Sequence, residues 1–249
     1  LGALAGLALA LLLFAPARWL AQALNSATGG QLQLVNPSGT VWQGQADLLL
    51  TGGPGSRDRA ALPQGVRWAL RPTWAAGPAL RLSLQLPCCA PDGLLTTLRP
   101  LMGGWEAALA PLQSRWPTAV LAGLGTPWNT LQPQGQLALQ TQALAMRWAA
   151  GRMVLSGQAQ LDARAMSSRL STLRPMGSYR LALQGGEAPT LTLSTLDGAL
   201  QLSGTGQWVG QRLRFAGEAS AAPEREAALS NLLNIIGRRN GARSIITVG

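Results

Sequence analysis

The chain has 249 residues, of which 47% are hydrophobic and only 12% are charged, and it contains 30 glycines and 16 prolines. This composition excludes a disordered chain, and it is too rich in turn-forming residues for an all-helical fold. The net charge of +10 comes from arginine alone, because the sequence has no lysine. The arginines are spread singly, and the densest group (Arg238, Arg239, Arg243) has no interleaved aromatic residues. We therefore expect no nucleic-acid partner.

The missing residue types exclude most catalytic machinery. Without histidine the chain has no Ser–His–Asp or Cys–His pair and no imidazole metal site. Without lysine it has no Ser–Lys dyad, no Schiff base and no phosphate-loop lysine. Ten scattered carboxylates and two thiols remain. We expect a protein that is not an enzyme, with no catalytic residue, cofactor or metal.

The beginning of the chain is apolar. Residues 1–17 carry no charge and are followed by Arg18 and Trp19, a residue type that favours membrane interfaces. Seventeen helical residues span about 25 Å, so continuation to residue 22 predicts a single transmembrane anchor over 1–22, with a linker over 23–30. The alternative is a signal peptide that is cleaved near Ala15–Ala17. Either interpretation places the rest of the chain across a membrane.

From residue 31 onward, apolar and polar residues alternate. Alternation with a period of two predicts strands that bury one face, and hence antiparallel pairing. The predicted strands cover 31–35, 46–50, 66–70, 80–86, 136–140, 152–161, 179–183, 190–195, 199–204, 211–217 and 243–249.

A Pro-x-Gly pattern precedes several of these strands. It occurs at 37–39, 63–65, 133–135 and 175–177, at irregular intervals that do not indicate a solenoid repeat. Proline at the second and glycine at the fourth position favour a type I β-turn. In "PMGSYRLAL" (175–183) the pattern lies beside Ser178 and Tyr179. Because no histidine or lysine is present to activate Ser178, we interpret this stretch as a corner that begins a strand.

Two stretches depart from strand character. Residues 105–117 begin with helix-forming residues but contain Pro111, which predicts a short helix or a covering loop. Residues 222–237 predict a helix, with Pro223 in the first turn and Gly237 as the C-terminal cap. This helix carries an apolar stripe that either docks a partner or packs on the protein's own sheet, formed by Leu229, Leu232, Leu233 and Ile236.

The remaining candidates for chemistry have simpler explanations. Glu224 and Glu226 are two residues apart on a helix and point in different directions, so they complement the helix N-terminus rather than form an acid pair. Asp197 and Gly198 have the signature of a hairpin turn. Cys88 and Cys89 are adjacent, and they form either a disulfide between neighbours or two thiols, with oxidation favoured in an oxidising compartment.

The C-terminal third resembles a known family. The stretches "LSTLRPMGSYRLALQG" (170–185), "LTLSTLDGALQLSGTGQW" (191–208) and 212–249 are similar to protein N of the type II secretion pathway. The upstream segments "GTVWQGQA" (39–46), "PQGVRWALRP" (63–72) and "LPCCAPDGL" (86–94) agree with this resemblance. It implies a non-enzymatic accessory component at the inner membrane of a Gram-negative bacterium, with its bulk in the periplasm and the secretin and inner-membrane platform proteins as partners.

Together these observations predict a mainly β fold. We expect a curved, extended antiparallel β-sheet with a C-terminal helix, preceded by the transmembrane helix. The β-rich domain covers 31–249, with two halves near 31–100 and 118–249, and the oligomeric state stays open. The alternative function is a periplasmic lipid-binding or lipid-transfer scaffold with an apolar groove, because an alternating sheet buries one apolar face that lipid chains suit.

Overall fold

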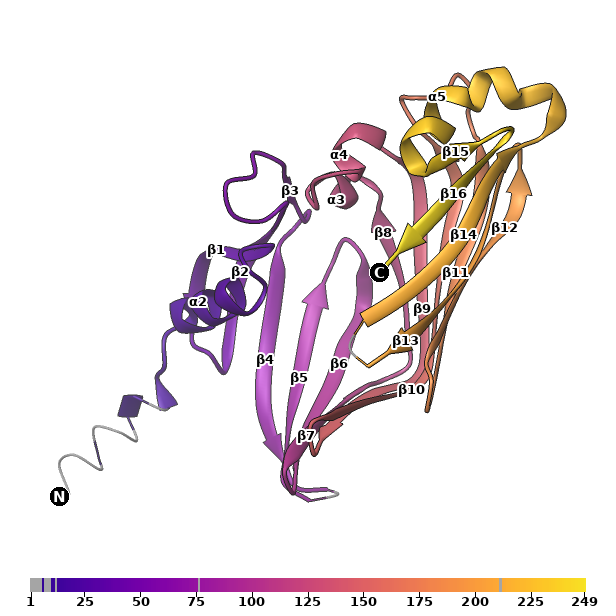
Figure 1. Ribbon diagram of the computed structural model, residues 1–249. Coiled ribbons are helices and arrows are strands. Elements are labelled where there is room, and N and C mark those ends of the chain that lie inside the picture. Colours follow the sequence, from indigo (N-terminus) through magenta and orange to yellow (C-terminus); the bar gives the residue numbers. More distant parts are fainter. Residues whose placement is uncertain (1–5, 7–9, 12, 76, 211) are drawn as a thin grey trace. The chain divides into compact units, whose positions relative to one another are not determined.

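The computed structural model describes residues 6, 10–11, 13–75, 77–210 and 212–249. The chain forms two compact units. Unit 1 comprises residues 1–98 and 120–129, and unit 2 comprises residues 99–119 and 130–249. Figure 1 labels their helices and strands. Both units are mainly β, and their described strand pairs, such as β4 with β5 and β10 with β11, are antiparallel, as the alternation predicts.

Unit 1 is a sheet whose strands follow the order β1-β2-β4-β5-β6, with β3 paired to β2. The central pair β4 and β5 place Trp68 opposite Leu84 and Leu70 opposite Leu82. Side chains alternate across a strand, so these apolar residues share one face. The strands are β1 (Leu32–Gly39), β2 (Gln43–Thr51), β3 (Arg59–Ala61), β4 (Val66–Thr73), β5 (Ala79–Leu86) and β6 (Ala90–Leu101), the last of which continues into unit 2.

Helix α2 (Ala17–Ala27) packs on the apolar face of this sheet. Its first residue, Ala17, is buried with Ala46 and Trp68, and Leu20 packs against the same cluster. The Trp68 ring lies over Gly44, where any side chain would collide with the ring and with the Ser38 carbonyl. The Trp68 indole N–H donates to the carbonyls of Thr40 (3.2 Å) and Val41 (3.1 Å). A fixed tryptophan over a glycine therefore holds β2, β4 and the helix together.

Unit 2 is a longer sheet in the order β7-β9-β10-β11-β12-β13-β14-β16-β15, with β8 also paired to β9. Most neighbours are joined by hairpins, so consecutive segments pair with each other. The strands are β7 (Gly104–Leu109), β8 (Leu112–Pro117), β9 (Gln134–Ala149), β10 (Arg152–Ser167), β11 (Gly177–Gly186), β12 (Thr190–Gly198), β13 (Leu200–Val209), β14 (Arg212–Ala221), β15 (Arg238–Asn240) and β16 (Arg243–Val248).

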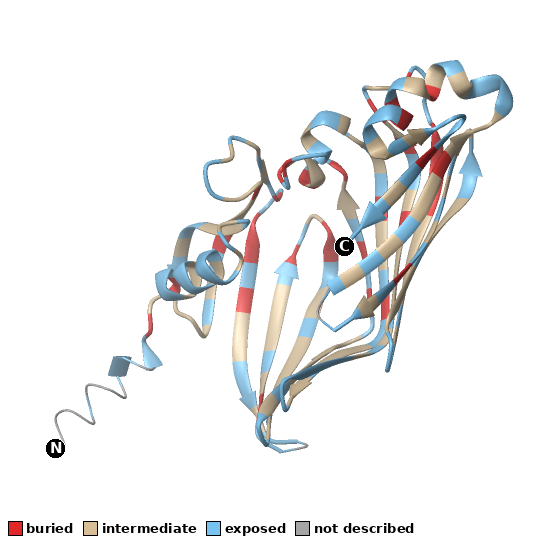
Figure 2. Ribbon diagram, in the orientation of Figure 1, coloured by how far each residue is buried: buried red, intermediate tan, exposed pale blue. Residues whose placement is uncertain are grey.

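Helix α5 (Glu226–Ile236), preceded by a 3-10 turn at Pro223–Arg225, contacts β14, β15 and β16. The residues beneath it, Ala219 and Ser244, have no exposed surface. Figure 2 shows buried positions gathered where this helix meets the strands. Gly237 differs from the expected left-handed cap, because its backbone is extended. A side chain there would collide with the Ile245 carbonyl, so the glycine is explained by close approach of two backbones.

The prediction for residues 105–117 was wrong, because the structure contains β7 and β8 there instead of a helix or covering loop. Both strands pair with β9, and Glu106 on β7 forms an ion pair with Arg147 on β9 at 2.8 Å. Pairing with a distant segment overrides the local preference for helix. Short helices occur elsewhere, at α3 (Ala119–Ala122) and α4 (Trp128–Leu131).

The turn prediction needs a similar correction. At Leu62–Gly65 the Gly65 N–H bonds the Leu62 carbonyl, and Gln64 has a φ of 65°, which is typical of a type II turn rather than type I. The other three Pro-x-Gly patterns begin or end strands without forming this turn. Strands β12 and β13 do form a hairpin, but Asp197 and Gly198 belong to β12 and pair with Ser178 and Gly177 of β11, so the chain turns after them rather than at them.

The N-terminal anchor is not supported by the described residues. Its last part, 17–22, belongs to α2, which also takes up 23–27 of the expected linker. Residues 1–5, 7–9 and 12 of the anchor lie outside the part of the chain that the structure describes. Among the helices of the described residues, none combines the length and apolar character that crossing a membrane requires.

Candidate functional site

The side chains at the Pro175–Gly177 corner that could suggest catalysis are buried. Ser178, at the start of β11, is buried, and its hydroxyl accepts a hydrogen bond from the Ala165 N–H at 3.1 Å. Burial, and to a lesser degree the charge of Asp197, raises the pKa of the neighbouring Tyr179 above its usual range. The described residues hold no cluster of three acidic or sulfur side chains suited to a metal. At this corner the Tyr179 hydroxyl therefore stays protonated, and the Ser178 hydroxyl is held in a hydrogen bond with the backbone.

The most buried carboxylate belongs to Asp162 on β10. It accepts two hydrogen bonds from Arg180 on β11, at 2.8 and 2.9 Å, and one from Arg164 at 3.1 Å. Gln160 donates a further bond at 3.2 Å. The Arg180 hydrogen bonds hold the pKa of Asp162 below its ordinary value, against the opposing effect of burial. With all its partners supplied by the sheet, this carboxylate ties β10 to β11.

The two cysteines lie in the turn between β5 and β6 and form a disulfide between neighbours. Cys89 is buried, with 1% of its surface exposed, and its N–H bonds the Leu86 carbonyl at 2.9 Å. Cys88 is partly exposed. The pair closes a hairpin turn.

The apolar stripe of the C-terminal helix lies against its own unit. Leu229 and Leu233 have no exposed surface, Leu232 is 2% exposed and Ile236 is partly buried. The acids beside them have separate positions, since Glu224 is exposed in the 3-10 turn and Glu226 pairs with Arg239 at 2.9 Å. The stripe therefore contributes to the core of unit 2 through its three leucines.

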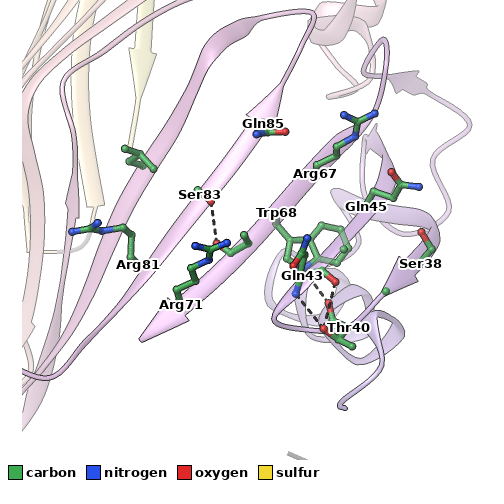
Figure 3. Close-up of a pocket in the computed structure, with 14 residues that line it drawn as sticks. Ser38, Thr40, Gln43, Gln45, Arg67, Trp68, Arg71, Arg81, Ser83 and Gln85 are labelled. Atoms are coloured by element: carbon green, nitrogen blue, oxygen red, sulfur yellow. Dashed lines mark hydrogen bonds between the residues drawn. The ribbon is translucent and has the colours of Figure 1, made fainter. Parts of the chain in front are cut away.

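A groove on the sheet of unit 1 gathers arginines that have no acidic partner. Register places Arg67 of β4 opposite Gln85 of β5, and Arg71 opposite Arg81, with Ala69 and Ser83 between these two rows. All three arginines are exposed. The groove is lined further by Gln43, Gln45 and Leu95. Figure 3 shows Ser83 between Gln85 on one side and Arg81 on the other.

The floor of the groove is low because its central residues are short. The Ser83 hydroxyl donates to the Ala69 carbonyl at 3.2 Å, which keeps it close to the sheet. The long side chains on either side form the two walls of the groove, one from Arg67 and Gln85 and the other from Arg71 and Arg81. Four residues along a strand separate the rows, so the walls lie about 13 Å apart. The groove crosses the strands and is polar along its length, with positive charge on both walls.

No carboxylate in the described part of the chain lies within ion-pairing distance of Arg67, Arg71 or Arg81. The ion pairs in that part involve other arginines, such as Arg147, Arg180 and Arg239. Direct opposition of Arg71 and Arg81 is unfavourable, because like charges face each other across the strand pair. An anionic ligand would relieve this repulsion. The sequence predicts the strands but not this juxtaposition. The available signal was the even spacing of Arg67 and Arg71 in "VRWALRP", which places them on one face, together with Arg81 in "LRLSLQL".

Comparison with protein families places the chain beside a known secretion family. No curated protein and no solved structure shows significant similarity to the chain. A family model described as type II secretion system (T2SS), protein N matches residues 30–246, which covers both β-rich units. This match extends beyond the C-terminal third, where the resemblance is most distinctive. The chain therefore belongs to the type II secretion system protein N family.

Proposed function

We propose that the protein is a non-enzymatic accessory component of the type II secretion machine, held at the inner membrane with its bulk in the periplasm. In this role it contacts the secretin, the inner-membrane platform proteins or both. The observation that carries the proposal is the family match over residues 30–246. The lack of histidine and lysine is consistent with a role in contacts rather than in chemistry.

The anchoring part of the proposal rests on the uncharged stretch that precedes α2. Its apolar residues suit the hydrocarbon interior of a bilayer. Helix α2 begins directly after Pro16 and packs on the sheet of unit 1, so an anchor before it would hold that unit close to the membrane surface. The arginine-lined groove supports the contact role, because it presents exposed positive charge on the sheet of unit 1.

Deletion and complementation test the proposal. We expect a secreting strain without this protein to retain the exported substrate in the periplasm, and the full chain to restore export. Purification of the restored protein in mild detergent, with mass spectrometry, should recover secretin or platform proteins. Normal export in the deletion strain, together with recovery of no secretion component, would overturn the proposal.

A second candidate, a lipid-binding scaffold, is favoured by one row of side chains in unit 2. Leu139, Leu161, Leu181 and Leu193 lie directly opposite one another across β9, β10, β11 and β12. Each is partly exposed, so the row offers an apolar surface to acyl chains.

Lipid analysis of the purified chain separates the two candidates. If the protein is a lipid scaffold, lipid should co-purify with the wild type. The Leu161→Asp variant should lose this lipid, whereas the Gln158→Asp variant, changed on the opposite face of the sheet, should keep it. The secretion role predicts recovery of secretion proteins from the wild type whether or not lipid is present. Lipid without any secretion component would favour the second candidate.

A further inference from the structure

We propose that the groove across β4 and β5 binds an extended acidic segment of a partner protein. The inference deepens the proposed function, because it names the chemistry of the segment that the accessory component would recognise. The site consists of Arg67, Arg71 and Arg81 on the walls and Ala69 and Ser83 on the floor. Figure 3 shows these arginines projecting from the two strands.

Charge identifies the ligand as anionic. Each guanidinium carries five N–H donors that suit carboxylates, and none of these three has a carboxylate partner in the part of the chain that the structure describes. Arg71 and Arg81 face each other directly, so one carboxylate between them would accept hydrogen bonds from both. The nearest acid on β2, Asp47, accepts its hydrogen bond from Asn36 at 3.0 Å.

Shape identifies the ligand as an extended chain. The walls lie about 13 Å apart and the floor between them is short, so a single small anion reaches only one wall. In an extended segment successive side chains point to opposite sides. Acidic residues at neighbouring positions would then reach the Arg67 wall and the Arg71–Arg81 wall in turn. Gln43 and Gln45 on β2, together with Gln85, offer amide groups to the backbone of the segment.

The floor of the groove argues against a lipid head group as the ligand. A phospholipid needs an apolar slot for its acyl chains, and this groove is floored by Ala69 and Ser83 and flanked by glutamines. Leu95 is exposed at one end and provides a single apolar contact. A protein segment needs no such slot, because its backbone and carboxylates find partners in the groove.

The test uses the full chain in mild detergent and a fluorescein-labelled ten-residue peptide in which pairs of Asp alternate with pairs of Ser, so that neighbouring carboxylates point to opposite walls. Fluorescence anisotropy is measured in about 150 mM NaCl, where long-range attraction is screened. We expect the double variant Arg71→Gln with Arg81→Gln to bind the peptide about tenfold more weakly than the wild type. The matched control, Arg152→Gln with Arg212→Gln, removes the same charge from exposed positions of unit 2 and should stay within about twofold.

A second variant keeps the charge and blocks the floor. Ser83→Tyr should weaken peptide binding while circular dichroism and the melting temperature show a folded protein. Equal weakening in the Arg152 and Arg212 control, or no binding at all, would overturn the proposal. So would binding of phosphatidylglycerol vesicles that depends on Arg71 and Arg81 when the peptide does not bind. These outcomes leave the secretion role standing, because the export test on the deletion strain decides that role independently.

Discussion

Among single residues, Asp162 offers the clearest prediction. Its side chain is almost fully buried, and Arg180, Arg164 and Gln160 all donate hydrogen bonds to it. Asp162→Asn keeps the size but removes the charge, so we expect a loss of about 1.5–3 kcal/mol in the free energy of unfolding. Urea denaturation at pH 7 measures this loss. The exposed Glu187→Gln serves as control and should change stability little.

The same carboxylate should make stability depend on pH. Because its pKa is lowered in the folded state, Asp162 contributes stability that is fully present above the unfolded value of about 3.9. This contribution is lost as pH falls through the folded pKa. The difference between wild type and Asp162→Asn should therefore be largest near pH 7 and shrink below about pH 4. A constant difference over this range would show that Asp162 is not stabilised as an anion.

At the groove, sequence reasoning identified strands but not the site. Alternation places Arg67 and Arg71 on one face of β4, and Arg81 on one face of β5. Whether those faces coincide depends on the strand register, which the turn between them determines. The Cys88–Cys89 disulfide shows a related limit, because adjacent cysteines leave two redox states open until the turn geometry is known.

For helix α5, two substitutions separate packing from docking. Leu233 has no exposed surface, whereas Ile235 on the same helix is 45% exposed. We expect Leu233→Ala to lower the free energy of unfolding by about 2–5 kcal/mol, because it leaves a cavity under the helix. Ile235→Ala should change it by less than about 0.5 kcal/mol. Denaturant titration of both variants tests this, and equal losses would contradict a packed stripe.

We expect the disulfide in the turn between β5 and β6 to contribute little to stability. The disulfide joins neighbouring residues and closes almost no loop, so it restricts the unfolded chain very little. Reduction should add two hydrogens to the mass while the melting temperature changes by only about 2 °C. Alkylation followed by mass spectrometry checks the first point, and a thermal melt checks the second. A large fall in melting temperature would contradict this expectation and would mean that the disulfide stabilises parts of the fold beyond the β5–β6 hairpin.

The helices and the shorter strands show why some elements were predicted and others missed. The strands of β9 to β14 have long alternating runs, and their hairpin partners follow directly in sequence. In contrast, β7 consists of residues that favour a helix locally, and it becomes a strand through contacts such as Trp105 opposite Trp148. Helix α2 was assigned to the membrane because its alanines and leucines continue the apolar start, although Ala17 packs on Trp68.

On the scale of the whole molecule, positive charge both supports and complicates the partner hypothesis. The net charge of +10 attracts any acidic ligand. Replacing Arg71 and Arg81 by glutamine lowers the net charge only to +8, so the variant still attracts such a ligand. Local binding and general attraction therefore have to be separated by ionic strength, since the Debye length is about 30 Å at 0.01 M salt and about 8 Å at 0.15 M.

This difference gives a prediction for a salt series. At about 10 mM NaCl the acidic peptide should bind the wild type more than tenfold more tightly than the Arg71→Gln, Arg81→Gln variant, because the two arginine contacts add to an attraction by net charge that both proteins share. As salt rises to about 150 mM, these exposed contacts are partly screened, so the ratio of the two dissociation constants should fall toward about tenfold. Anisotropy titrations at several salt concentrations measure this ratio. A ratio near one at every concentration would mean that the peptide recognises net charge, and a recognition site in the groove would then have no support.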